Sequence, residues 1–135
     1  MVDETLFQVT IEGGANLVRE LDAHGIPPET AAWFFHPDRE RWRLLLQFDE
    51  SREKYATLLE IAKLINARDD IFDVLSTGDI TVVEPSDPWA VAIREAVHTK
   101  AEVTQKPFGP SYTNGIYIPR GLAYRSVAPQ SQPAK

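Results

Sequence analysis

His36 and Asp38 are the two residues of this 135-residue chain whose types and spacing come nearest to a reactive pair. A His-x-Asp motif can offer an imidazole nitrogen and a carboxylate to a divalent metal, as a small hydrolase or nuclease would require. Asp49 and Glu50 lie at the other end of the same predicted hairpin arm, about 20 Å or more away at the rise of a strand. The four side chains therefore cannot meet within one hairpin. The run 37–40 is better explained as a turn in which Asp38 bonds its own backbone.

Other catalytic patterns are missing from the sequence. There is no cysteine, which excludes a disulfide framework, a Cys-based zinc site, an iron–sulfur cluster and a thiol nucleophile. There is also no Gly-x-Ser-x-Gly elbow of the kind that exposes a serine nucleophile. We expect no cofactor and no metal, and an enzymatic role would depend on His36 and Asp38.

Aromatic residues interleaved with arginine raise the possibility of a single-stranded nucleic-acid binder. Bases stack on exposed aromatic rings while arginines hold the phosphates. Trp42 lies between Arg41 and Arg43 in the sequence. In a strand, however, Trp42 points to the face opposite both arginines, which favours a core position for its ring.

The segment 110–135 is predicted to bind a partner protein. It carries a charge of +3 and no acidic residue, whereas the whole chain carries −6. Tyrosine and arginine are enriched in protein interfaces. The residues expected to form the contact are Tyr112, Tyr117, Arg120, Tyr124 and Arg125. The alternative is that Tyr117 and Tyr124 are cross-strand neighbours packing a sheet, with Arg125 at a solvated edge.

These residues must be positioned by a β-hairpin over 30–48, the clearest local pattern in the chain. Its second arm alternates, with Trp42 and Leu44 on one face and arginines on the other. Its first arm has Trp33 and Phe35 on one face and further apolar residues on the other, which is typical of a strand buried on both sides. The cover for the second face is either a C-terminal segment or a second subunit. We therefore expect a homo-oligomer with Trp33 and Phe35 at its interface.

Three helices are expected. Residues 4–24 fit both a strand and a helix, and the helix formers of 15–24, stopped by Gly25, favour a helix. The pair Gly13-Gly14 costs roughly 1 kcal/mol per residue in a helix, so it indicates a close approach to a sheet or a partner helix. A second helix over 52–67 is expected to have Ser51 as its N-cap and to bury a stripe that includes Tyr55 and Leu59. A third helix runs from Pro88 to about residue 98, with Asp87 as its N-cap, and is expected to bury Trp89 in the core.

The remaining elements are short. Strands are expected over 79–84, 103–108, 115–118 and 122–127, with a connector over 69–77 and a flexible tail over 128–135. The order of elements predicts one α+β domain over 1–127. Its expected architecture is a largely antiparallel sheet of about five to six strands with three helices on one face.

The runs 31–37, 41–44 and 21–25, closed by Ala123-Tyr124-Arg125, resemble a loose group of short bacterial α+β proteins. The resemblance supports the order of elements, including a helix over 4–24. It implies no activity and no site residues.

Charge and hydropathy complete the expectations. Residues 1–30 carry −5 and residues 81–135 carry +2, so opposite patches could orient the association of two copies. The acidic balance argues against duplex DNA binding. No run approaches ~18 apolar residues and the first residues are acidic, so we expect a cytoplasmic protein without a membrane span. The function expected from all of this is a non-catalytic, self-associating protein-interaction module.

Overall fold

The computed structural model describes residues 8–68, 75 and 77–128. The chain begins with α1 (Gln8–Ala23), the hairpin β1 (Thr30–His36) and β2 (Arg41–Gln47), and α2 (Lys54–Ala67). A short 3-10 turn, η1 (Thr77–Asp79), leads into β3 (Ile80–Val83) and α4 (Pro88–Ala96). The last third contains β4 (Lys106–Phe108), β5 (Ser111–Thr113), β6 (Ile116–Ile118) and β7 (Gly121–Ser126). The expected connector falls largely, and the expected tail almost wholly, outside the described residues.

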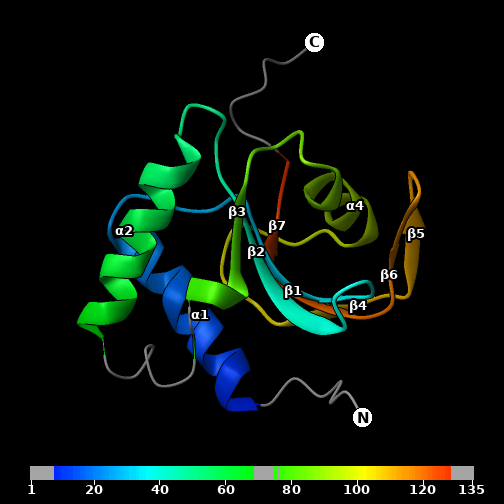
Figure 1. Cartoon of the computed structure of the whole chain (residues 1–135), viewed down its shortest axis with the longest axis horizontal. Coiled ribbons are helices and arrows are strands. Elements are labelled where there is room, and N and C mark those ends of the chain that lie inside the picture. Colours follow the sequence, from blue (N-terminus) through cyan, green and yellow to red (C-terminus); the bar gives the residue numbers. More distant parts are fainter. Residues whose placement is uncertain (1–7, 69–74, 76, 129–135) are drawn as a thin grey trace.

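Five strands form one mixed sheet in the order β3-β2-β1-β7-β4, and β5 and β6 form a separate two-stranded ribbon. All pairs in the larger sheet are antiparallel except β2 and β3. The parallel pair needs a crossover connection, which the segment containing α2 provides (Figure 1). The α+β class and the mainly antiparallel sheet are thus confirmed.

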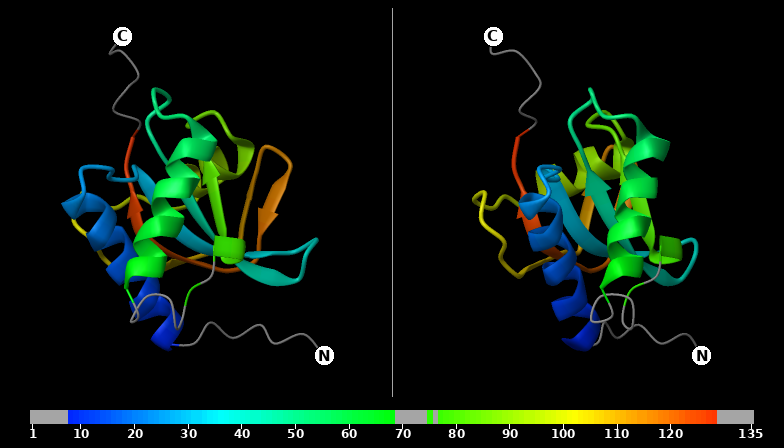
Figure 2. Two further views of the ribbon diagram at one scale, coloured as in Figure 1. Left: turned by 60° about the vertical axis from the view of Figure 1, so that its left-hand side comes forward. Right: turned by 90° about the vertical axis from the view of Figure 1, so that its left-hand side faces the viewer.

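The helices cover both faces of the sheet rather than one. Helices α1 and α2 lie on one face, whereas α4 and the β5–β6 ribbon lie on the other (Figures 1 and 2). On the first face, Trp33 and Leu44 pack with residues of α1 and α2. On the second, Phe34 and Leu45 pack with α4 and with Ile118 of the ribbon. The apolar second face of β1 is the physical reason, because it must be covered and α4 is the helix that covers it.

Helix α1 replaces the strand that the alternation over 7–12 also permitted, as far as the described residues reach. It ends before Gly25, whose φ of +76° is the left-handed conformation that closes many helices. Gly14 allows the helix to lie close to the sheet. A Cβ atom at Gly14 would stand 2.3 Å from the Tyr124 hydroxyl and 2.9 Å from Trp33 Nε1. The close approach expected of the glycine pair is therefore confirmed at Gly14.

The other two helices differ from expectation in detail. Glu53, rather than Ser51, is the N-cap of α2 and accepts a hydrogen bond from the Ala56 N–H. The buried side of α2 carries Ile61 and Ile65. Tyr55 and Leu59, which the apolar stripe placed inside, are 74% and 58% exposed. Helix α4 begins as expected, with the Asp87 carboxylate accepting from the N–H groups of Trp89 and Ala90.

Strand β5 was not expected. It forms because Asn114 and Gly115 adopt φ values of +51° and +83°, which suit a tight turn between antiparallel strands. The Asn-Gly pair is the sequence signal that identifies this hairpin.

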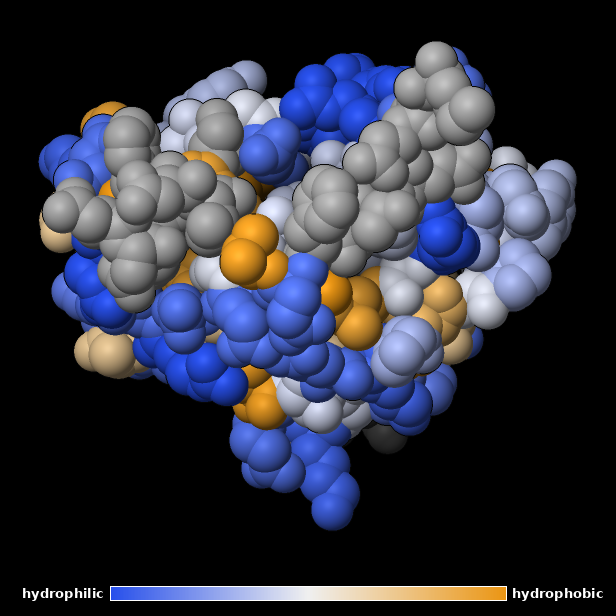
Figure 3. Space-filling model, turned by 90° about the horizontal axis from the view of Figure 1, so that it is seen from below, coloured by the Kyte–Doolittle hydropathy of each residue, from blue (hydrophilic) through white to orange (hydrophobic). Residues whose placement is uncertain are grey.

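None of the helices in the described ranges is long and apolar enough to cross a membrane. Seen from below, hydrophobic residues form small, separate patches between hydrophilic ones (Figure 3).

Candidate functional site

The β5–β6 hairpin carries the most exposed aromatic pair of the described chain. Tyr112 of β5 and Tyr117 of β6 stand directly opposite each other and are 73% and 47% exposed. Ile116 and Ile118, the neighbours of Tyr117 along β6, point the other way and pack in the core beside α4. The hairpin, whose ribbon lies at the right-hand edge of Figure 1, is therefore anchored on one side and presents two phenol rings on the other.

Arg120 follows β6 and is exposed. Its guanidinium lies 5.9 Å from the ring centre of Phe35 and 5.4 Å from that of Trp42. These are distances at which a cation is attracted by an aromatic ring. Arg120 therefore lies over two aromatic rings of the β1–β2 hairpin and is itself exposed to solvent.

Tyr124 was expected in the same contact surface, but it is completely buried. Its hydroxyl accepts a hydrogen bond from Trp33 Nε1 at 2.9 Å and donates one to the Ile11 carbonyl at 2.5 Å. Burial raises the pKa of this hydroxyl well above its usual range. Tyr124 thus joins α1, β1 and β7 and is unavailable to a partner, because its polar group is used inside the protein.

Arg125 is also buried, with 7% of its surface exposed. Two of its guanidinium nitrogens donate to the two carboxylate oxygens of Asp22, at 3.0 and 2.7 Å. It donates further to the carbonyls of Pro28 and Ala101. Arg125 links β7 to the end of α1 inside the protein. The prediction that it forms a surface contact is wrong.

The residues expected at an oligomer interface lie inside the protomer. Trp33 and Phe35 are 2% and 6% exposed. The Phe35 ring meets that of Trp42 edge to face, with centres 5.7 Å apart, beneath Arg120. Helices α1 and α2 cover the face of Trp33, and α4 and the ribbon cover the opposite face. Of the two sources of cover that the sequence left open, the C-terminal part of the same chain supplies it.

His36 lies in a hollow of about 310 Å³ between the β1–β2 hairpin and the start of α4. This hollow, called the His36 hollow below, is lined by Phe34, His36, Arg39, Arg43, Leu45, Thr81, Asp87 and Trp89. Burial lowers the pKa of His36, with Arg39 and Arg43 acting in the same direction and Asp38 opposing them. This shift favours the neutral form of the ring.

Asp38 is exposed in the turn and does not line the His36 hollow. Across the described ranges, no group of three or more His, Cys, Asp or Glu residues is arranged to hold a metal ion. The structure does not bring His36, Asp38, Asp49 and Glu50 together as a ligand set.

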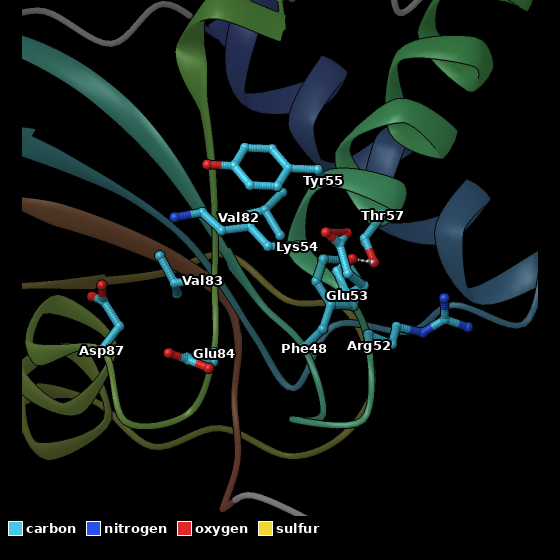
Figure 4. Close-up of a pocket in the computed structure, with 10 residues that line it drawn as sticks. All are labelled: Phe48, Arg52, Glu53, Lys54, Tyr55, Thr57, Val82, Val83, Glu84 and Asp87. Carbon is cyan, nitrogen blue, oxygen red and sulfur yellow. Dashed lines mark hydrogen bonds between the residues drawn. The ribbon is translucent and has the colours of Figure 1, made fainter.

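A second hollow, of about 360 Å³, lies between the start of α2, β3 and the start of α4 (Figure 4). Lys54 and Tyr55 extend from α2 over β3, and Arg52 points away (Figure 4). Two carboxylates that line this hollow, those of Glu53 and Asp87, accept hydrogen bonds from backbone N–H groups and cap α2 and α4. These two side chains have structural roles, and the hollow has no nucleophile paired with a base.

Sequence reasoning missed the role of Trp89. It was expected in the core, whereas it is half-buried and stacks on His36 with ring centres 4.7 Å apart. Nothing local in the sequence indicates this contact, because the two residues are 53 positions apart and belong to different elements.

Comparison of the chain with protein-family models, with curated proteins and with solved structures found no match.

Proposed function

We propose that this protein is a non-catalytic protein-interaction module of the cytoplasm whose contact surface is the β5–β6 hairpin. The observation that carries the proposal is the exposure of Tyr112 and Tyr117 side by side on a hairpin anchored from behind. Tyrosine brings a large contact area and loses little conformational entropy on binding. Exposed Arg120 follows the hairpin directly and adds a cation of the kind enriched at interface hot spots.

The hairpin is also the surface on which we expect self-association. The apolar faces of β1 do not need a second subunit as cover, because the described residues of one protomer cover both of them. Two exposed tyrosines can still pair with those of a second copy, because an isologous contact brings equivalent residues together. The charge of the region, which lacks acidic residues after position 109, favours an acidic partner surface instead.

The proposal is tested with the double variant Tyr112→Ser/Tyr117→Ser and a matched control, Tyr55→Ser. Tyr55 is as exposed as Tyr112 but lies on α2. Proteins captured from native cell extract are compared quantitatively for the wild type and both variants. We expect the double variant to lose specific partners that the wild type and the control retain equally. Capture of the same partners in the same amounts by all three would contradict the proposal.

Light scattering at tens of micromolar separates self-association from binding of a different protein. If the partner is a second copy, the wild type and the Tyr55→Ser control show a dimer mass and the double variant shows a monomer mass. A wild-type monomer means that the hairpin binds another protein. A dimer that survives the double substitution places the dimer interface elsewhere.

A further inference from the structure

We propose that the His36 hollow binds a nucleotide, with the planar base on Trp89 and the phosphate held by Arg39 and His36. This inference is independent of the hairpin and of the proposed interaction function. It assigns a ligand class to a part of the molecule that the hairpin surface does not include.

Strand pairing places Arg41 and Arg43 on the face of the sheet that carries the hollow. Phe34 is paired with Arg43 and His36 with Arg41 across β1 and β2, and directly paired residues point to the same face of a sheet. Trp42 points to the opposite face and packs against the core beneath α1 and α2. Trp42 and the arginines beside it in the sequence therefore lie on opposite faces of the sheet, as the alternation predicts. On the face that carries Arg43, the tryptophan is Trp89 of α4.

Trp89 offers an aromatic surface to the hollow. Its ring centre lies 4.9 Å from that of Phe34 and 4.7 Å from that of His36. The Phe34 and His36 centres are 5.8 Å apart, which is too close for them to lie on opposite faces of the indole. Both rings are thus on one side of Trp89, the side that carries two residues of the hollow. No aromatic ring within the described residues stacks on its other face, so a base at the mouth of the hollow can stack on that face while its phosphate reaches into the hollow.

The polar groups of the hollow suit a phosphate. The Nδ1 atom of His36 accepts the Arg39 backbone N–H at 3.3 Å, so the neutral ring carries its hydrogen on Nε2 as a donor. The exposed Arg39 side chain forms no ion pair within the described residues. Its guanidinium can therefore turn toward an anion and bind a phosphate through two parallel hydrogen bonds.

Arg43 contributes a fixed charge at the same hollow. Its guanidinium donates to the Gly78 carbonyl at 2.6 Å and to the Thr81 hydroxyl at 2.6 Å. These are uncharged acceptors, so the positive charge of Arg43 is held in place without an ion pair to a carboxylate. A charge that is already oriented loses little freedom when a ligand binds.

The balance of charge and the size of the hollow both favour a small anion that carries a ring. Two arginines face one carboxylate, that of Asp87, and Asp87 already caps α4. This local excess of positive charge occurs in a chain whose net charge is −6. The volume of about 310 Å³ lies at the lower end of small-molecule sites, roughly 300–1,000 Å³, which leaves room for the phosphate and sugar of a single nucleotide.

The inference is tested by calorimetric titration with adenosine monophosphate, adenosine, inorganic phosphate and a short adenylate oligonucleotide. We expect adenosine monophosphate to bind at least tenfold more tightly than either adenosine or phosphate, because only it uses both the ring and the charge. An oligonucleotide that binds far more tightly than the mononucleotide identifies a single strand as the source of the nucleotide. Comparable affinity per site identifies the free nucleotide.

Two variants and two controls locate the site. Arg39→Gln removes an exposed charge and is expected to weaken binding of adenosine monophosphate about tenfold with the fold intact. Trp89→Leu removes the stacking surface and is expected to reduce the preference for adenosine monophosphate over phosphate. Arg19→Gln and Tyr55→Ser, on α1 and α2, should change neither value.

Circular dichroism checks that each variant is folded. The inference is overturned if adenosine monophosphate binds no more tightly than phosphate, or if Arg39→Gln binds it as well as Arg19→Gln does. Because Arg39 is exposed, this second comparison stands even if Trp89→Leu is unstable. The capture experiments on the hairpin report on separate residues, so failure of one proposal leaves the other standing.

Discussion

Gly14 is where the backbone of α1 meets the Trp33–Tyr124 hydrogen bond. The substitution Gly14→Ala places a methyl group against Tyr124 and Trp33, and overpacking of this kind typically costs about 1–3 kcal/mol. The gain in helix propensity, about 1 kcal/mol, offsets only part of it. We expect a net loss of stability in urea unfolding.

The atom nearest the added methyl group is the Tyr124 hydroxyl oxygen, so a double-mutant cycle with Tyr124→Phe tests the cause. Tyr124→Phe alone should cost about 1–3 kcal/mol, because it leaves the Trp33 N–H and the Ile11 carbonyl with a missing partner. In that background, Gly14→Ala should cost less than in the wild type. If the losses of unfolding free energy caused by Gly14→Ala and Tyr124→Phe simply add in the double variant, the contact with the Tyr124 hydroxyl is not the cause of the Gly14→Ala loss.

His36 gives the stability a pH dependence whose sign follows from its environment. Burial and the nearby arginines lower the pKa of His36 in the folded protein, whereas the unfolded ring titrates near a pKa of about 6.5. Below that pH the unfolded chain binds more protons than the folded one, so stability falls as the pH drops through about 6.5 toward the lower folded value.

We expect His36→Gln to reduce the loss of stability between pH 7.5 and 5.5, measured by urea unfolding at both values. His98→Gln, which removes an exposed imidazole, is the matched control. Asp38 acts in the opposite direction on His36, so Asp38→Asn should steepen the dependence. An unchanged slope in His36→Gln would mean that His36 is not the titrating group.

Among the elements, the β5–β6 hairpin depends most on its turn, because its two strands have only three residues each. Gly115 has a φ of +83°, and a β-branched side chain in that region costs about 1–2 kcal/mol. We expect Gly115→Val to loosen the hairpin locally, seen as faster amide hydrogen exchange over 111–118 with little change in β1. Thr113→Val, which keeps the turn, is the control. Equal exchange in both variants would show that the turn does not hold the hairpin.

Helix α4 shows how one element serves two surfaces. Its inner residues Ala90 and Ile93 cover the second face of the sheet, and its first turn carries Trp89 into the His36 hollow. The proline at its first position and the Asp87 cap fix where the helix begins. Trp89 is therefore positioned by local signals, although the residues it meets are distant in sequence.

For the molecule as a whole, the Asp22–Arg125 pair joins the end of α1 to the last strand across 103 positions. Removing one partner of a buried ion pair is strongly destabilising, by about 3–5 kcal/mol when both charges are buried. Asp22 is one-third exposed, so the lower part of that range applies. We expect Arg125→Met to lose roughly 3 kcal/mol in thermal or urea unfolding, with Arg120→Met as an exposed control. A loss no larger than that of the control would contradict a structural role for Arg125.

The sequence by itself was sufficient for the elements whose patterns are local. Alternation identified the β1–β2 hairpin and the two faces of β1, and capping residues located the start of α4. The charge and composition of 110–135 suggested Tyr112, Tyr117 and Arg120 as contact residues, with sheet packing as the alternative for Tyr117, and all three are exposed. Their role in binding a partner stays a prediction.

The arrangement of those elements came from contacts between distant parts of the chain. A two-residue period indicates which side chains share a face, but it contains no information on which element will cover that face. For this reason the third helix lies opposite the other two, and Tyr124 and Arg125 are buried by partners 91 and 103 positions away. The same long-range packing brings Trp89 to His36, because α4 covers the face of the sheet opposite the one that α1 and α2 cover.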